Sequence, residues 1–285
     1  MDIRRILLLL SGTEVGEAAL GTALIVARMW SAHLSAVYIA VEPRAAAESL
    51  VVSLSKRAVE DLVAAAEREH NTRISAVRAM FDRLVAASIE LAQPAPDKAN
   101  ASFEVVSRDE PDTAAHLGRV ADLVVIPSPQ SAEDVSSSNV LHSILFDSGR
   151  PIIVAPYTVP AHIGRRICVA WNGSAESATA VWFAIPWLKR AESVRVLWSK
   201  DYQRRGPQAP ELIDYLALHG IRADAAPFGP IDREVGAGLL AAARDFGADL
   251  LTMGAYSHSR LRQVILGGVT RHVLETARLP VLMSR

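Results

Sequence analysis

The chain has 285 residues, half of them apolar, and a formal net charge of −1. This length allows one or two sizeable hydrophobic cores, and the near-neutral charge argues against binding of nucleic acid through bulk positive charge. The single cysteine, Cys168, excludes a disulfide framework and a cysteine-based zinc site, which fits the cytoplasm. No window is long and apolar enough to span a membrane, and the apolar run at residues 6–10 is too short for a signal peptide.

Residues 1–157 alternate between strand-like and helix-like patterns. The continuous apolar run at residues 3–10 is typical of a strand that is buried on both faces of a sheet. Residues 45–93 have helical periodicity, and the polar residues 70–72 leave open whether this segment is two helices or one bent helix. The same reasoning predicts the other elements of this half: strands at 33–41, 103–106, 123–126 and 151–155, and helices at 14–30, 113–120 and 139–147.

The pattern starts again after a proline-containing linker at residues 156–160. Residues 165–171 repeat the strand at 3–10, and Ala248–Asp249 repeats Ala121–Asp122 before the fourth strand. We therefore expect two domains built from one repeated unit, at residues 1–157 and 162–285, with a long helical insertion at about residues 45–93 of the first. The second copy is expected to contain strands at 165–171, 194–198, 221–226, 250–253 and 280–283, and helices at 175–189, 210–219, 232–246 and 268–278.

Strands that alternate with helices predict an α/β fold, with a parallel sheet in each domain and helices on both faces. Right-handed crossovers then favour the strand order 3-2-1-4-5. In such sheets, ligands bind beyond the carboxyl ends of the strands, near the point where the strand order reverses. In the second copy, Asn172–Gly173 and Gly254 flank that point.

A glycine-rich loop with cationic side chains follows the fourth strand of the second copy. The strand ends at Gly254, and Gly267–Gly268 precedes the last helix. Glycine lets a ligand approach the backbone, and the free N–H groups at a helix start attract an anion. The alternative is that these glycines only make a tight turn. Residues 1–157 hold 14 Lys/Arg and 20 Asp/Glu, whereas residues 158–285 hold 16 and 11, a difference that suits an anionic ligand or the docking of the two halves.

These residues resemble the universal stress protein family, and the chain looks like a tandem universal stress protein with two such domains. Nucleotide-binding members of that family show Gly-x2-Gly-x9-Gly-[Ser/Thr] after the fourth strand and an Asp after the first. Gly254 and Gly267 match the first and third glycines of this pattern. Ser257 replaces the second glycine, Gly268 replaces the Ser/Thr, and Asn172 stands where the Asp is usual.

The resemblance implies a Rossmann-like (adenine-nucleotide-hydrolase-like) fold with a five-stranded parallel sheet in each domain. It also implies that the second domain binds ATP or a related adenine nucleotide, with the phosphates over Gly254, Gly267 and Gly268. The adenine is expected nearer Asn172 and the end of the strand at 194–198. The residues predicted to bind the nucleotide are Asn172, Gly173, Gly254, Ser257, Gly267, Gly268, Val269 and Thr270.

The first copy is predicted to have lost this site. Its fourth strand is followed by Pro127–Ser128–Pro129, and proline offers no N–H to a phosphate, while Ser11 takes the place of the family's Asp. The resemblance further implies that the fifth strands, at 151–155 and 280–283, cover each other's edges, either within one chain or between copies.

We therefore expect a cytoplasmic regulatory module of the stress response that binds an adenine nucleotide and has no catalytic residue and no metal site. His272 and Glu275 share a helix face but lack a third ligand, so they are predicted to be a surface pair. One alternative is an interaction protein without a ligand, in which both copies serve assembly. A slow nucleotide hydrolase is disfavoured, because the sequence offers no evident base and no acidic pair for magnesium. No nucleic acid or membrane is expected as a partner.

Overall fold

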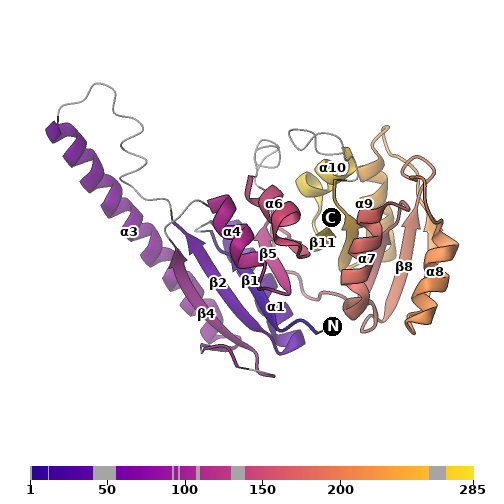
Figure 1. Cartoon of the computed structure of the whole chain (residues 1–285), viewed down its shortest axis with the longest axis horizontal. Coiled ribbons are helices and arrows are strands. Elements are labelled where there is room, and N and C mark those ends of the chain that lie inside the picture. The colour runs from indigo at the N-terminus through magenta and orange to yellow at the C-terminus, as the bar shows by residue number, and fades with distance from the viewer. Residues whose placement is uncertain are drawn as a thin grey trace.

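The structure is a computed structural model, and it describes residues 2–11, 13–40, 56–91, 93–95, 97–106, 110–129, 139–256 and 268–285. The first half alternates strands with helices, as predicted (Figure 1). Its elements are β1 (Arg5–Leu9), α1 (Glu14–Trp30), β2 (His33–Ile39), α3 (Lys56–Ala86), β3 (Glu90–Leu91), β4 (Asn100–Val106), α4 (Glu110–Gly118), β5 (Leu123–Pro127), α6 (Asn139–Ser143), the π-helix η1 (Ile144–Ser148) and β6 (Ile152–Ala155).

The second half repeats this alternation without a long helical insertion. Its elements are β7 (Arg166–Ala170), α7 (Ala175–Leu188), β8 (Ser193–Trp198), α8 (Ala209–Leu218), β9 (Ala223–Pro227), α9 (Val235–Phe246), β10 (Leu250–Gly254), α10 (Gly268–Thr276) and β11 (Val281–Ser284).

The described strands form one continuous sheet, in the order β3-β4-β2-β1-β5-β6-β11-β10-β7-β8-β9. Within each half, the five main strands are parallel and follow the predicted order 3-2-1-4-5. The two halves join through an antiparallel pairing of the fifth strands, β6 and β11, in which Ile153 lies opposite Leu282. The fifth strands therefore cover each other's edges within one chain.

The repeated Ala–Asp sequence has the same structural role in both halves. The Asp122 carboxylate accepts hydrogen bonds from the backbone N–H groups of Arg4 and Arg5, at 2.8 and 2.9 Å. Asp249 accepts three such bonds, from Gly164, Arg165 and Arg166, at 2.9, 3.1 and 3.0 Å. In each half, this carboxylate ties the start of the first strand to the start of the fourth.

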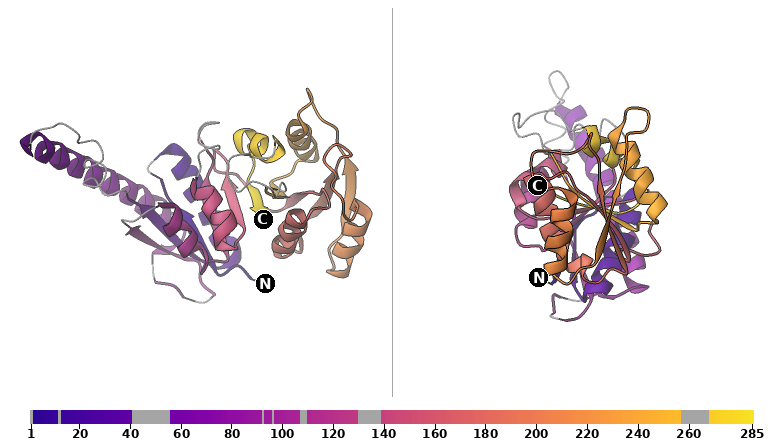
Figure 2. Two further views of the ribbon diagram at one scale, coloured as in Figure 1. Left: turned by 45° about the horizontal axis from the view of Figure 1, so that its top comes forward. Right: turned by 90° about the vertical axis from the view of Figure 1, so that its right-hand side faces the viewer.

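Helices cover both faces of the sheet, as Figure 2 shows. One face packs against α1, α3, α7 and α8, and the other against α4, α6, α9 and α10. Side chains of β1 alternate between these two cores: Ile6 and Leu8 face the first, and Leu7 and Leu9 the second. The unbroken apolar run of β1 follows from burial on both faces.

Aromatic contacts join the halves beside the β6–β11 seam. On one face, the rings of Trp30 and Trp187 meet edge to face at 5.4 Å, and the Arg190 guanidinium lies 4.4 Å from the Trp30 ring. On the other face, the ring of Tyr256 lies 5.0 Å from that of His142 and 5.4 Å from that of Phe146, the latter on η1. The antiparallel pairing explains the second contact, because it places the carboxyl end of β10 beside the end of η1.

Two elements of the first half depart from the prediction, and one settles an alternative that the sequence left open. Helix α3 is one helix of 31 residues, and the polar residues 70–72 do not interrupt it, while residues 45–55 of the predicted segment lie outside the described residues. It ends at Ala86, and the short strand β3 pairs with β4 where helical structure was predicted. This change follows from Ser88 and Ile89, whose N–H groups both bond to the Val85 carbonyl and close the helix. The helix at 139–147 is split into α6 and η1, which ends at Gly149 with a φ of 68°.

Candidate functional site

The sheet register brings most of the predicted nucleotide-binding residues to one edge. Ala170 at the end of β7 pairs with Met253 of β10 and with Leu197 of β8. Asn172–Gly173 therefore lies at the same edge of the sheet as Gly254. Gly268, Val269 and Thr270 form the first turn of α10, whereas Ser257 and Gly267 lie outside the described residues.

Asn172 is buried at this edge and forms hydrogen bonds with neighbouring loop residues. Only 2% of its surface is exposed, and its side-chain oxygen accepts a hydrogen bond from the Ser174 N–H at 3.0 Å. Its backbone carbonyl accepts two further bonds, from the Arg204 N–H at 2.7 Å and from Gln203 Nε2 at 3.1 Å. Ser174 in turn caps α7 by accepting from the Ser177 N–H at 3.2 Å. This set of contacts builds a turn, for which an amide serves as well as a carboxylate.

The loop between β8 and α8, residues 199–208, lies over this turn. Trp171 Nε1 donates to the Pro207 carbonyl at 2.9 Å. Gly173 has a φ of +76°, and a Cβ on Gly206 would lie 2.0 Å from the Gly173 carbonyl oxygen, so both positions require glycine. Tyr202 of the same loop is buried, which raises the pKa of its phenol to about 12. The chain itself thus covers the corner where the adenine was expected.

The glycines on the phosphate side have different surroundings. A Cβ on Gly254 would lie 2.5 Å from the Ser177 nitrogen and 2.6 Å from the Glu176 carbonyl carbon. Gly254 therefore lets the first turn of α7 pack on β10, and the sequence interpretation of this glycine as a ligand approach was incomplete. Gly268 is exposed, and a Cβ there would meet none of the described residues within 4 Å. As far as the described residues show, the start of α10 is thus open, and its first turn contains no acidic residue.

Tyr256 is a residue at this edge that sequence reasoning missed. It lies two residues after Gly254, has a φ of 60° and is 8% exposed. A positive φ is costly for a large side chain, and the packing against His142 and Phe146 holds it there. Its hydroxyl is buried without a hydrogen-bond partner among the described residues. No local sequence pattern predicts such a contact, because it joins residues of different halves.

The first half has an open cavity at the corresponding corner of its sheet. This cavity, which we call the crevice, has a volume of about 390 Å³ and lies at the carboxyl ends of β1, β2 and β5. Its wall includes three hydroxyl side chains, and Ser11 and Thr13 lie 3.0 Å apart, oxygen to oxygen. The lining residues are Leu9, Leu10, Ser11, Thr13, Val15, Val37, Ile39, Ile126, Pro127, Ser128, Pro129, Val140 and Leu141.

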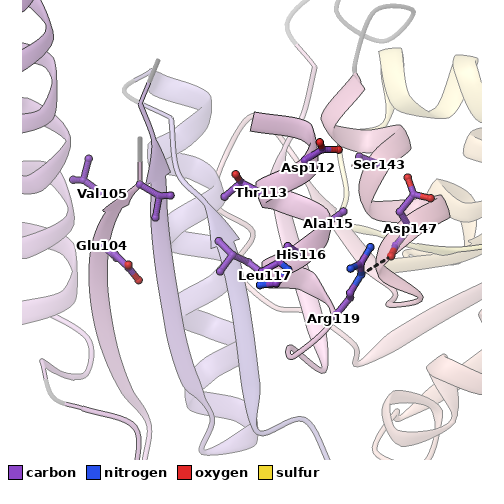
Figure 3. Close-up of a pocket in the computed structure, with 11 residues that line it drawn as sticks. Glu104, Val105, Asp112, Thr113, Ala115, His116, Leu117, Arg119, Ser143 and Asp147 are labelled. Carbon is purple, nitrogen blue, oxygen red and sulfur yellow. Dashed lines mark hydrogen bonds between the residues drawn. The ribbon is translucent and has the colours of Figure 1, made fainter. Parts of the chain in front are cut away.

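A larger groove of about 940 Å³ lies between β4, α4 and η1 (Figure 3). Its walls carry carboxylates and cations together, and Arg119 Nε donates to the Asp147 carbonyl at 3.1 Å. A related groove of about 790 Å³, between α9 and α10, includes Arg244 and Arg278. None of the described residues that line these two grooves is a predicted nucleotide-binding residue.

Within the part of the chain that the structure describes, no three His, Cys, Asp or Glu side chains form a cluster that could hold a metal ion. None of the described helices combines the length and apolar character needed to cross a membrane.

The chain consists of two repeated units, each with a parallel sheet and helices on both faces, joined through the β6–β11 pairing. This arrangement defines a tandem Rossmann-like α/β protein. The family model described as "Universal stress protein family" matches residues 164–285. The second half of the chain is therefore a domain of the universal stress protein family, and the first half repeats its fold.

Solved structures support this architecture along the whole chain. A universal stress protein from Archaeoglobus fulgidus DSM 4304 is 14% identical, with a TM-score of 0.66 and 98% of each chain covered. A functionally unknown protein from Pseudomonas aeruginosa PAO1 is 15% identical, with a TM-score of 0.54, covering 99% of this chain and 92% of its own. At these identities, the likeness shows the fold alone. No curated protein matches the sequence.

Proposed function

We propose that the chain is a regulatory module of the stress response whose second half binds ATP or another adenine nucleotide. The observation that carries this proposal is the open start of α10 at the carboxyl edge of a universal stress protein domain. Backbone N–H groups at a helix start and the helix dipole both favour a phosphate there. Thr270, which is 5% exposed, supplies a hydroxyl in the same turn.

The phosphates are proposed to lie at the start of α10, and the base at the corner formed by Asn172 and Gly173. Asn172 and Gly173 are covered by residues 199–208, so a base at that corner requires this loop to move. The proposal assigns no catalytic residue and no metal, and it keeps the module in the cytoplasm. A reducing compartment suits the lone Cys168, whose burial raises the pKa of its thiol to about 12 and leaves it unreactive.

The same loop favours a second candidate, an interaction protein without a nucleotide. In that case, residues 199–208 are a permanent part of the domain core, and the surfaces of both halves serve assembly. The covered state of Asn172 and the contact of Gly173 with Gly206 support this candidate.

Calorimetric titration with ATP separates the two candidates. We expect the wild type to bind ATP and Gly268→Val to bind at least tenfold more weakly, about 1.4 kcal/mol, because the side chain occupies the phosphate position. We expect the fold to tolerate this change, since a Cβ at Gly268 meets none of the described residues within 4 Å. Gly229→Val is the matched control, because that site is equally open and lies outside the proposed phosphate position.

Each other outcome decides against the proposal. Equal affinity of wild type and Gly268→Val would place the phosphates elsewhere. A wild type that does not bind at millimolar ATP would support the interaction protein without a nucleotide.

A further inference from the structure

The crevice of the first half has the size of a small-molecule site. Its volume of about 390 Å³ falls within the range of roughly 300–1,000 Å³ that is usual for ligand pockets. It also lies where ligands bind in this class of sheet, next to the point at which the strand order reverses between β1 and β5.

The chemistry of the crevice wall does not suit a phosphate. None of the described residues that line it is charged. Pro127 and Pro129, which lie on either side of Ser128 at the end of β5, have no N–H to donate. An anion beside these described residues would lose its hydration without gaining from them a cation or a row of backbone donors.

The same wall suits an uncharged, apolar ligand. Part of the wall is formed by three well-packed apolar side chains, Leu9, Val37 and Ile126, which are between 2% and 7% exposed. Thr13 is already occupied, because it caps α1 by accepting from the Gly16 N–H and also bonds with Ser11. Ser128, which is 4% exposed, remains as a hydroxyl in the wall that can bond with a ligand.

We propose that the crevice binds an uncharged, largely apolar small molecule whose single polar group bonds with the Ser128 hydroxyl. The apolar wall supplies the affinity, and the hydroxyl fixes the orientation of the ligand. This site is independent of the nucleotide site proposed for the second half, since the two share no residue.

The test uses the full chain and N-phenylnaphthylamine, an uncharged aromatic probe with one N–H group, whose fluorescence rises in apolar surroundings. We expect saturable binding of one probe per chain. Val140→Trp fills the crevice from α6 and should weaken binding at least tenfold. Val120→Trp is the matched control: this valine lies in the same half, is 62% exposed and does not line the crevice, so probe binding should be unchanged.

Two further variants test whether the probe binds in the crevice. Ile39→Trp fills the crevice from β2 and should give the same loss, which covers the case in which Val140→Trp fails to fold. Ser128→Ala should weaken binding severalfold and leave the fold intact. The proposal is overturned if the wild type shows no saturable binding, if both filling variants fold and bind normally, or if saturating ATP displaces the probe. Gly268→Val should leave probe binding unchanged whatever its effect on ATP.

Discussion

At the carboxyl end of its first strand, the first half has an open apolar crevice, whereas the second half has its own loop, residues 199–208. Both corners start from the same design, in which a hydroxyl side chain caps the first helix: Thr13 caps α1, and Ser174 caps α7. In the second half, Gly206 packs directly on Gly173. The described residues thus line a cavity at the first corner and fill the second one.

The largest effect is expected from a change that opens the second corner. Gly206→Val would place a Cβ 2.0 Å from the Gly173 carbonyl oxygen, so the loop must leave its position. We expect a loss of about 3 kcal/mol in unfolding free energy. Trypsin cleavage after Arg204 and Arg205 should become at least tenfold faster.

Gly229→Val, which has open space around it, is the control for this change. Cleavage at the wild-type rate in Gly206→Val would mean that the loop contact is not what holds the corner closed. An ATP affinity that rises in the same variant would place the base beneath the loop.

A smaller effect, about 1 kcal/mol, is expected as the difference between the paired carboxylates of the two halves. Asp249 accepts three backbone hydrogen bonds and Asp122 accepts two. At roughly 1 kcal/mol for each bond, Asp249→Ala should lower the unfolding free energy by about 3 kcal/mol and Asp122→Ala by about 2. Urea unfolding measures both. The larger loss in Asp122→Ala would contradict this comparison.

The smallest effect is the dependence of stability on pH, which we attribute to two histidines of the first half. Burial, opposed in part by the bond to Asn100 and aided by the charge of Arg5, lowers the pKa of His33. Burial also lowers the pKa of His142, which packs against Tyr256. The folded protein therefore favours neutral histidine. This stability is fully present above the ordinary histidine pKa of about 6.5 and is lost as pH falls through that value towards the lowered ones.

We expect the unfolding free energy to be lower at pH 5.5 than at pH 7.5 as a result of these two groups. His142→Phe keeps a ring against Tyr256 but cannot take up a proton, so urea titrations of this variant should show a smaller difference between the two pH values. A difference as large as that of the wild type would exclude His142 as a contributor.

Much of the fold could be predicted because its signals are local. The apolar run of β1 indicates burial on both faces within a few residues, and the repeated Ala–Asp sequence marks the start of the fourth strand in each half. The pairing of β6 with β11 was implied by the resemblance to the universal stress protein family, which left open whether it forms within one chain or between copies. The π-helix η1 and the strand β3 were missed because they depend on how the ends of longer helices close.

The candidate site was harder to predict because its contacts are distant in the sequence. Asn172 was identified as a ligand-binding residue, yet its carbonyl bonds to Gln203 and Arg204, about thirty residues further on. Gly254 matches a nucleotide pattern, and its lack of a Cβ also lets α7 pack closely. The sequence alone does not distinguish a glycine that makes room for a ligand from one that makes room for a helix. The sequence therefore predicted where these residues lie, at the carboxyl edge of the sheet, better than it predicted what they contact.

The seam between β6 and β11 has a consequence for assembly. Ile152, Ile153, Leu282 and Met283 are buried in it, so a half without its neighbour would present an apolar, unpaired edge to any chain it met. The linker at residues 156–160 holds the two edges together at an effective concentration on the order of millimolar. The pairing is thereby a property of each single molecule and persists on dilution, whereas the same pairing between separate chains would depend on how much protein the cell contains.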